Sequence, residues 1–148
     1  TLSGVMTLNR DLTLSATSAT GQFTVSGGMV GSGDLIKTGA GSLYLNVGTA
    51  RGGIGDILIN EGTALMANSL SMSENMRLSV ASGTTFTYTS AGANVAGLDG
   101  AGTVIANVSG TTLRSFRLGG TGNYSFSGVL TNINTAPLGL MLDLKEGG

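Results

Sequence analysis

Apolar residues alternate with polar residues in a series of short segments that runs along almost the whole chain. Successive side chains of a strand point to opposite faces, so each such segment is expected to bury one face and expose the other. The alternating sets are Met6 and Leu8, Leu12 and Leu14, Phe23 and Val25, Leu43 and Leu45, Ile57 and Ile59, Leu70 and Met72, Leu78 and Val80, Phe86 and Tyr88, Phe116 and Leu118, Tyr124 and Phe126, and Leu140, Leu142 and Leu144. Thr, Ser, Gly and Asn, which are poor helix formers, fill most polar positions. The sequence therefore predicts an all-β fold.

Glycine-rich clusters separate these segments. They are Ser26-Gly27-Gly28, Thr38-Gly39-Ala40-Gly41, Gly52-Gly53-Ile54-Gly55 and Gly119-Gly120-Thr121-Gly122. Gly supplies the positive-φ turns that redirect a chain between short strands. A strand every 8 to 12 residues or so fits a sandwich, a barrel or a solenoid. Residues 31–35 (GSGDL) resemble residues 100–104 (GAGTV), 69 positions later, and this imperfect repetition favours a solenoid.

Composition excludes several classes of function. The chain has no Cys and no His, which excludes disulfides, thiolate or His-based metal sites, and Ser-His-Asp or Cys-His catalysis. A net charge of -1 gives no electrostatic reason to expect binding to nucleic acid or to an anionic membrane. No run of 18 apolar residues is present, so we expect no membrane-spanning helix in this segment.

Residues 31–45 read GSGDLIKTGAGSLYL. This stretch resembles the autotransporter-associated β-strand repeat, whose pattern is roughly G-x-G-x-L-x-K-x-G-x-G-x-L-x-L. The matching positions are Gly31, Gly33, Leu35, Lys37, Gly39, Gly41, Leu43 and Leu45. Residues 53–65, 96–104 and 119–128 are similar to later parts of the same unit, so the likeness covers most of residues 23–148.

The resemblance implies a right-handed parallel β-helix (solenoid) from a secreted or surface protein of bacteria. We expect residues 1–148 to form a single β-helix segment. With about 20 residues to a coil, the chain would make roughly seven coils and a rod on the order of 35 Å long, at about 4.8 Å per coil.

The two ends of the chain suggest a partner. Residues 1–4 (TLSG) resemble the tail of the repeat, and residues 145–148 (KEGG) stop where it would next require apolar alternation. A solenoid exposes an unpaired strand edge at each end. We therefore expect either neighbouring repeats of a longer array or copies of the chain stacked head to tail, through residues 1–14 and 138–148.

Paired carboxylates are the remaining route to catalysis, because polysaccharide-cleaving enzymes also use β-helices and two carboxyls can cleave a glycosidic bond. The carboxylates are Asp11, Asp34, Asp56, Glu61, Glu74, Asp99, Asp143 and Glu146. No spacing marks a catalytic pair, and we interpret them as solvated turn residues. Residues 52–56 (GGIGD) resemble one unit of a calcium-binding β-roll, but Asp56 lies one position early and no second copy follows.

The remaining polar motifs have structural interpretations. Glycines 31, 33, 100 and 102 lack the strand-to-helix context of a phosphate cradle and are interpreted as turn residues. Lys37 and Lys145 occupy matching repeat positions and are expected on the solvent face. Arg114 and Arg117 flank Phe116; outward arginines on an alternating strand explain them, although they would also suit an acidic glycan. Asn107 and Asn123 begin glycosylation sequons, which in a bacterial protein would usually carry nothing.

The sequence thus predicts an extracellular or cell-surface structural or adhesive module: a stalk, an adhesin segment or a filament subunit. We expect no enzyme activity, no catalytic, cofactor-binding or metal-binding residues and no cofactor. Expected partners are copies of the chain or neighbouring repeats, with surface glycans as a further candidate. The alternatives are a polysaccharide lyase or hydrolase on the same scaffold, and a glycan-binding passenger.

Overall fold

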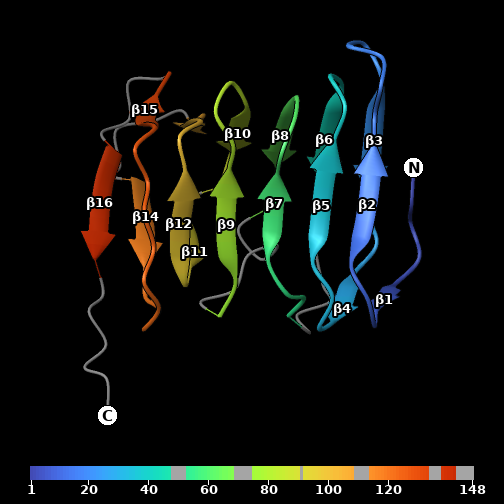
Figure 1. The fold of residues 1–148 in the computed structure, drawn as a ribbon, viewed down its shortest axis with the longest axis horizontal. Helices are drawn as coiled ribbons and strands as arrows, with labels where there is room; N and C mark the ends of the chain where they lie inside the picture. Colours follow the sequence, from blue (N-terminus) through green and yellow to red (C-terminus); the bar gives the residue numbers. More distant parts are fainter. Residues whose placement is uncertain (48–52, 69–74, 91, 109–113, 134–137, 143–148) are drawn as a thin grey trace.

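The computed structural model describes residues 1–47, 53–68, 75–90, 92–108, 114–133 and 138–142 (Figure 1). All regular elements in these residues are β-strands, and none of the described residues forms a helix that could cross a membrane. The strands are β1 (Met6–Leu8), β2 (Leu12–Ser15), β3 (Gln22–Val25), β4 (Met29–Gly31), β5 (Leu35–Thr38), β6 (Ser42–Leu45), β7 (Ile57–Ile59), β8 (Thr63–Met66), β9 (Arg77–Val80), β10 (Thr85–Tyr88), β11 (Gly92–Val95), β12 (Gly97–Gly100), β13 (Thr103–Ala106), β14 (Arg114–Leu118), β15 (Val129–Asn132) and β16 (Leu138–Leu142). The predicted all-β fold is confirmed.

The strands stack as a parallel β-solenoid. A six-stranded sheet has the order β15-β13-β10-β8-β6-β3, and a five-stranded sheet has the order β12-β9-β7-β5-β2. Smaller sheets join β11-β14-β16 and β1-β4. In Figure 1 the five-stranded sheet rises at the front, the six-stranded sheet returns behind it, and the chain advances from right to left. The coil is therefore right-handed, as parallel crossover connections require.

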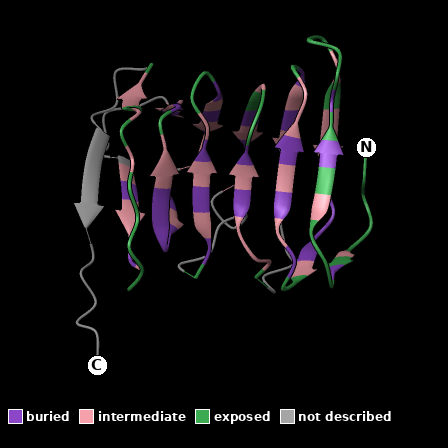
Figure 2. Cartoon of the chain, viewed as in Figure 1, coloured by how far each residue is buried: buried purple, intermediate pink, exposed green. Residues whose placement is uncertain are grey.

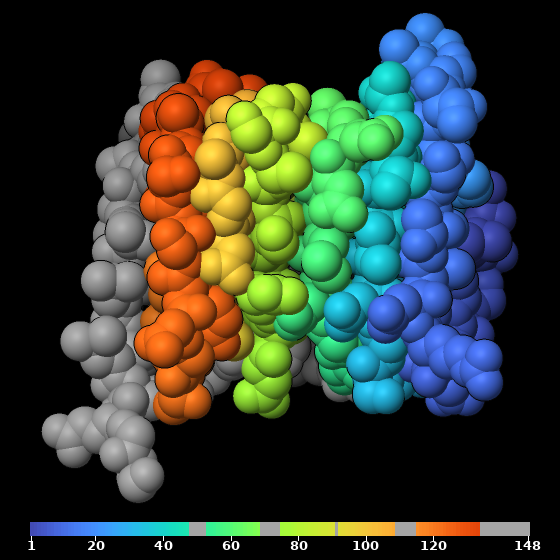
Figure 3. All heavy atoms as spheres, viewed as in Figure 1, coloured from blue at the N-terminus to red at the C-terminus, as the bar shows by residue number. Residues whose placement is uncertain are grey.

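The coils are longer than the predicted repeat of about 20 residues. In the five-stranded sheet the register aligns Leu12, Leu35, Ile57, Leu78 and Leu98 in succession. These positions are 23, 22, 21 and 20 residues apart, and the bridge from Gly100 to Phe126 spans 26. The prediction of seven coils was therefore too high, because corner segments lengthen most coils and only five coils contribute to this sheet. Successive coils lie in contact along the face seen in Figure 3.

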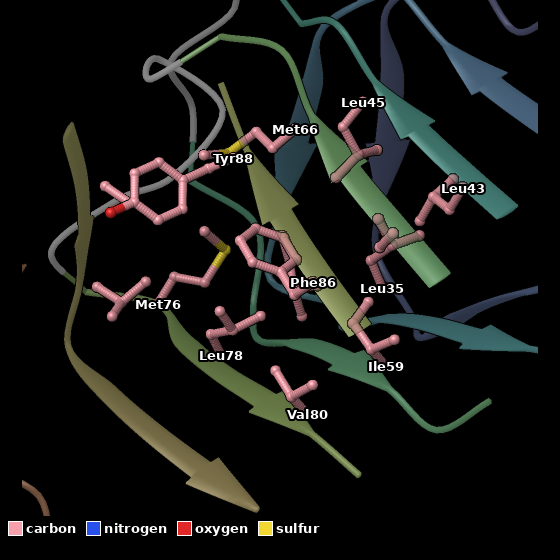
Figure 4. Packing of buried hydrophobic residues seen from close by; sticks show 14 of the residues in the cluster. Leu35, Leu43, Leu45, Ile59, Met66, Met76, Leu78, Val80, Phe86 and Tyr88 are labelled. Carbon is pink, nitrogen blue, oxygen red and sulfur yellow. The ribbon is translucent and has the colours of Figure 1, made fainter. Parts of the chain in front are cut away.

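The core consists of inward-facing rows that run along the solenoid axis. Figure 2 shows the buried positions recurring from coil to coil, and Figure 4 shows side chains of the two large sheets meeting inside. Large and small side chains are matched along the rows of the six-stranded sheet: Ala64 lies beside Phe86, and Ala106 beside Tyr88. Such matching lets the interior fill without voids or overlap.

The two similar segments that lie 69 residues apart do not occupy equivalent positions in their coils. Residues 31–35 lead into the five-stranded sheet, whereas residues 100–104 lead into the six-stranded sheet. Both are corners at which the chain passes close to the preceding coil. A Cβ atom at Gly33 would overlap the carbonyl oxygen of Arg10, and one at Gly102 would overlap that of Ala81. The likeness therefore reflects a shared steric requirement, which glycine meets.

The strand predicted at Tyr124 and Phe126 does not form, and this segment instead lies over the edge of the five-stranded sheet. Phe126 makes only an isolated bridge to Gly100, and Tyr124 is 37% exposed. The ring of Tyr124 lies against Gly97 of β12, so closely that a Cβ atom there would overlap the ring. This segment therefore covers the edge of the five-stranded sheet without extending it. Leu70, Met72 and Leu144, also predicted in strands, lie outside the described residues.

Tyr88 places a polar group in the core. Its side chain is fully buried, its ring centroid is 5.9 Å from that of Phe116, and its hydroxyl has no hydrogen-bond partner in the described part of the chain. Burial raises the pKa of the Tyr88 hydroxyl to about 12, because the phenolate would lose its hydration.

Folding stability should therefore fall at alkaline pH. An unfolded tyrosine ionises near pH 10, so between about pH 10 and pH 12 the unfolded state loses a proton that folded Tyr88 keeps. The free energy of unfolding should be nearly unaffected by this group below pH 10 and should drop by about 2 kcal/mol by pH 12. Tyr88→Phe should remove that loss and should be no less stable at pH 7.

Urea denaturation of both proteins between pH 7 and pH 11.5 measures the difference. Tyr44→Phe, on the outer face of β6 and half-buried, is the matched control and should behave as the unmodified chain. An identical alkaline loss in Tyr88→Phe would contradict the assignment.

Candidate functional site

Acidic residues recur at one place in successive coils. Asp11, Asp34 and Asp56 immediately precede β2, β5 and β7, which are neighbours in the five-stranded sheet. Arg77 occupies the equivalent position in the next coil, because the register pairs Ile57 with Leu78. In β12 the equivalent position is Gly97, and Asp99 lies two residues further along the strand. We call these four residues together with Asp99 the aspartate ladder.

Each carboxylate in the ladder binds the main chain of the following coil. The amide of Asp34 donates to Asp11 Oδ1 at 3.0 Å, and the amide of Asp56 donates to Asp34 Oδ1 at 2.7 Å. The amide of Arg77 donates to Asp56 Oδ1 at 3.0 Å, and the amide of Ser125 donates to Asp99 Oδ1 at 2.6 Å. Asp11, Asp34 and Asp56 thus satisfy amide groups at the starts of β5, β7 and β9, and Asp99 satisfies an amide of the segment that covers β12, through strong charge-assisted hydrogen bonds.

Arg77 joins two carboxylates of the ladder. Its Nε atom lies 2.8 Å from Asp56 Oδ2 and its Nη1 atom 3.3 Å from Asp99 Oδ2. Partial burial works against the charged guanidinium, but the charges of Asp56 and Asp99 and their hydrogen bonds outweigh it and raise the pKa of Arg77. The interpretation of these carboxylates as solvated turn residues is therefore incomplete: Asp34, Asp56 and Asp99 are half-buried and hold one coil to the next.

Lys37 is buried, and its predicted position on the solvent face was wrong. It stands in an inward row between Leu14 and Ile59, with none of its surface exposed. Its Nζ atom donates to the carbonyl oxygens of Thr38 at 2.7 Å, Gly39 at 2.6 Å and Glu61 at 3.2 Å. The apolar stem fills the core while the ammonium group binds corner carbonyls of two successive coils. Burial lowers the pKa of Lys37, and the charge of Glu61 opposes that shift.

Two other side chains complete this corner between the large sheets. Glu61 Oε2 accepts the amide of Gly39 at 2.7 Å, so Glu61 accepts hydrogen bonds from the preceding coil through both its side chain and its carbonyl oxygen. Thr84, the other buried polar residue of the described core, donates to the carbonyl oxygens of Ala81 at 2.7 Å and Ile59 at 3.3 Å. Polar groups buried at this corner are thus held by main-chain partners, as burial requires.

The other candidate residues are not brought together. Among the described residues, no three carboxylates are grouped so that they could hold a metal ion. Arg117 is half-buried on β14, and its Nε atom has no hydrogen-bond partner in the described part of the chain. Glu74, Asp143, Lys145, Glu146, Gly52 and the side chain of Arg114 lie outside the described residues. Asn107 is half-buried, and Asn123 is exposed.

A spacing signal for the ladder is present in the sequence. Residues 11, 34, 56, 77 and 99 are separated by 23, 22, 21 and 22 positions. The first three spacings equal the coil lengths in the five-stranded sheet, and the last exceeds its coil by two residues. Close pairs of carboxylates in the sequence do not reveal the ladder, because the partners of these side chains are main-chain amides one coil away.

No protein family, curated protein or solved structure matches this chain. The resemblance to the autotransporter-associated repeat therefore rests on the motif residues alone. The structure shows a β-solenoid, which is consistent with such a repeat.

Removing one carboxylate from the ladder should loosen the contact between two coils. Asp34→Ala leaves the half-buried amide of Asp56 without its acceptor, and should lower the free energy of unfolding by about 1 to 2 kcal/mol. Asp34→Asn is the matched control, because its amide oxygen can still accept that hydrogen bond. Urea denaturation at pH 7 compares the two variants, and equal stability of Asp34→Ala and Asp34→Asn would contradict the role given to this side chain.

Proposed function

We propose that this chain is a structural and adhesive module of a bacterial surface protein, a stiff solenoid segment that acts outside the cell as a stalk or filament subunit. The observation that carries the proposal is the unbroken parallel register of the two large sheets. Main-chain hydrogen bonds in such a solenoid run along its axis, and the apolar rows inside follow the same direction. Bending or stretching the rod would strain both at once. The extracellular location is supported by the repeat motif at residues 31–45, and a composition without Cys is compatible with it.

The two ends of the solenoid favour continuation of the stack. The large hydrophobic residues exposed in the described part of the chain are confined to terminal segments: Leu2, Val5, Tyr124, Val129 and Ile133. Among the described residues, strand β15 pairs with β13 on one side only, and a strand edge without a partner offers main-chain groups for pairing. We propose that a further coil covers this edge, supplied by neighbouring repeats or by a second copy stacked head to tail through residues 1–14 and 138–148.

The lyase or hydrolase alternative gains no support from the described carboxylates. Asp34, Asp56 and Asp99 accept main-chain amides, and two of them also bind Arg77. A general acid or nucleophile must instead face a substrate.

Head-to-tail assembly can be tested by placing a charge at each end. Val5 and Ile133 are 68% and 60% exposed, so Val5→Lys with Ile133→Lys should leave the fold intact and disfavour stacking, because the added charges would be buried at the junction. We expect the unmodified chain to form axial oligomers in sedimentation velocity and rods or fibres in electron microscopy, and the double variant to be monomeric.

The matched control is Ser79→Lys, which adds a charge to the outer face of β9 in the middle of the rod. It should assemble like the unmodified chain. A monomeric unmodified chain at high concentration, or fibres that persist in the double variant, would refute assembly between copies.

A further inference from the structure

The outer face of the six-stranded sheet carries no charged side chain. Its outward positions form two rows across the strands, because the residues between them point into the core. One row is Gln22, Ser42, Thr63, Thr85, Thr103 and Val129, and the other is Thr24, Tyr44, Leu65, Thr87, Ile105 and Thr131. All these residues are half-buried or exposed. We call this surface the neutral face.

Charged side chains are instead concentrated on other parts of the described chain. The aspartate ladder lies along the five-stranded sheet, Glu61 lies at a corner, and Arg117 lies on β14. A charged ligand would therefore find no counter-charge in the strands of the neutral face. A neutral ligand would have no charged group to desolvate there.

Hydroxyl groups form an unbroken line along the neutral face. Ser42, Thr63, Thr85 and Thr103 are neighbours on four consecutive strands, about 4.8 Å apart. None of the four makes a side-chain hydrogen bond within the described part of the chain. Each hydroxyl can both donate and accept, so the line is available to a ligand that presents hydroxyl groups at a regular spacing.

The second row adds apolar contacts beside the hydroxyl line. Tyr44, Leu65 and Ile105 point outward from β6, β8 and β13 and are half-buried. A pyranose ring presents C–H groups on its faces and hydroxyl groups at its rim, which would suit a row that mixes apolar side chains with threonines, beside a row of hydroxyl groups. Successive rings of an extended β-linked polysaccharide also advance by a length close to the spacing of strands.

We propose that the neutral face binds an extended, neutral, β-linked polysaccharide whose chain runs along the solenoid axis. The inference rests on the proposed adhesive function and names its ligand class. The rigid sheet holds the hydroxyl and apolar groups in place before binding, which lowers the ordering cost for the protein. The arginines of β14 play no part in this site.

The test measures depletion of the protein by three insoluble neutral polysaccharides, microcrystalline cellulose, chitin and β-1,3-glucan, and by insoluble polygalacturonate as the acidic comparison. Thr63→Lys with Thr85→Lys places charge in the middle of the hydroxyl line. Thr13→Lys with Ser79→Lys is the matched control on the outer face of the five-stranded sheet.

We expect saturable binding to at least one neutral solid, about tenfold weaker in the Thr63/Thr85 variant because the added charges must be desolvated, and unchanged in the control. Absence of saturable binding to all three, stronger binding to polygalacturonate, or an equal loss in the control would overturn the proposal. So would a dimer that dissociates only in the Thr63/Thr85 variant, which would assign the neutral face to a second copy.

Failure of this proposal is distinguishable from failure of the proposed assembly. The Val5→Lys and Ile133→Lys variant should lose stacking and keep polysaccharide binding, because neither residue belongs to the two outward rows. Loss of binding in that variant would place the ligand site at an end of the rod and overturn the assignment to the neutral face.

Discussion

Each coil keeps its place by hydrogen bonding, in one register, to the coil before it and the coil after it. That constraint fixes which side chains are inside. A slip of one residue would turn the row of Leu35, Ile57 and Leu78 toward water and bring its outward neighbours into the core. The matching of Ala64 with Phe86 and of Tyr88 with Ala106 adds a second condition, because this register places a small side chain beside each large one.

The corners are where this regular stacking needs special residues. The main chain turns there and leaves groups that the sheets do not satisfy. Glycine permits close approach, aspartates of the ladder accept amides at strand starts, and Lys37 and Thr84 donate to carbonyl oxygens at the corner between the large sheets. Most of the polar residues that could be considered as a catalytic set thus hold successive coils together.

The fold could be predicted from the sequence because it depends on a local pattern. Alternation at Phe86 and Tyr88, or at Ile57 and Ile59, specifies which face is buried. The roles of Lys37 and Asp34 could not be predicted in that way, because they depend on main-chain groups one coil distant. Lys37 lies two positions after Leu35, so alternation itself places it on the buried face. The expectation that its charge keeps it in water is wrong because carbonyl oxygens lie within reach of its ammonium group while its stem fits an apolar row. The number of coils was overestimated because corner lengths vary.

Disulfide formation across the six-stranded sheet tests the parallel register most directly. The chain has no native Cys, so only the introduced pair can form a disulfide within it. Thr63 and Thr85 are register partners on β8 and β10, with Cα atoms about 4.8 Å apart, within the range that a disulfide spans. Thr63 and Thr87 would lie about 8 Å apart, beyond it. We expect a variant with Cys at 63 and 85 to oxidise readily, and one with Cys at 63 and 87 to stay reduced under the same conditions. Equal or faster oxidation of the 63/87 variant would contradict the parallel solenoid.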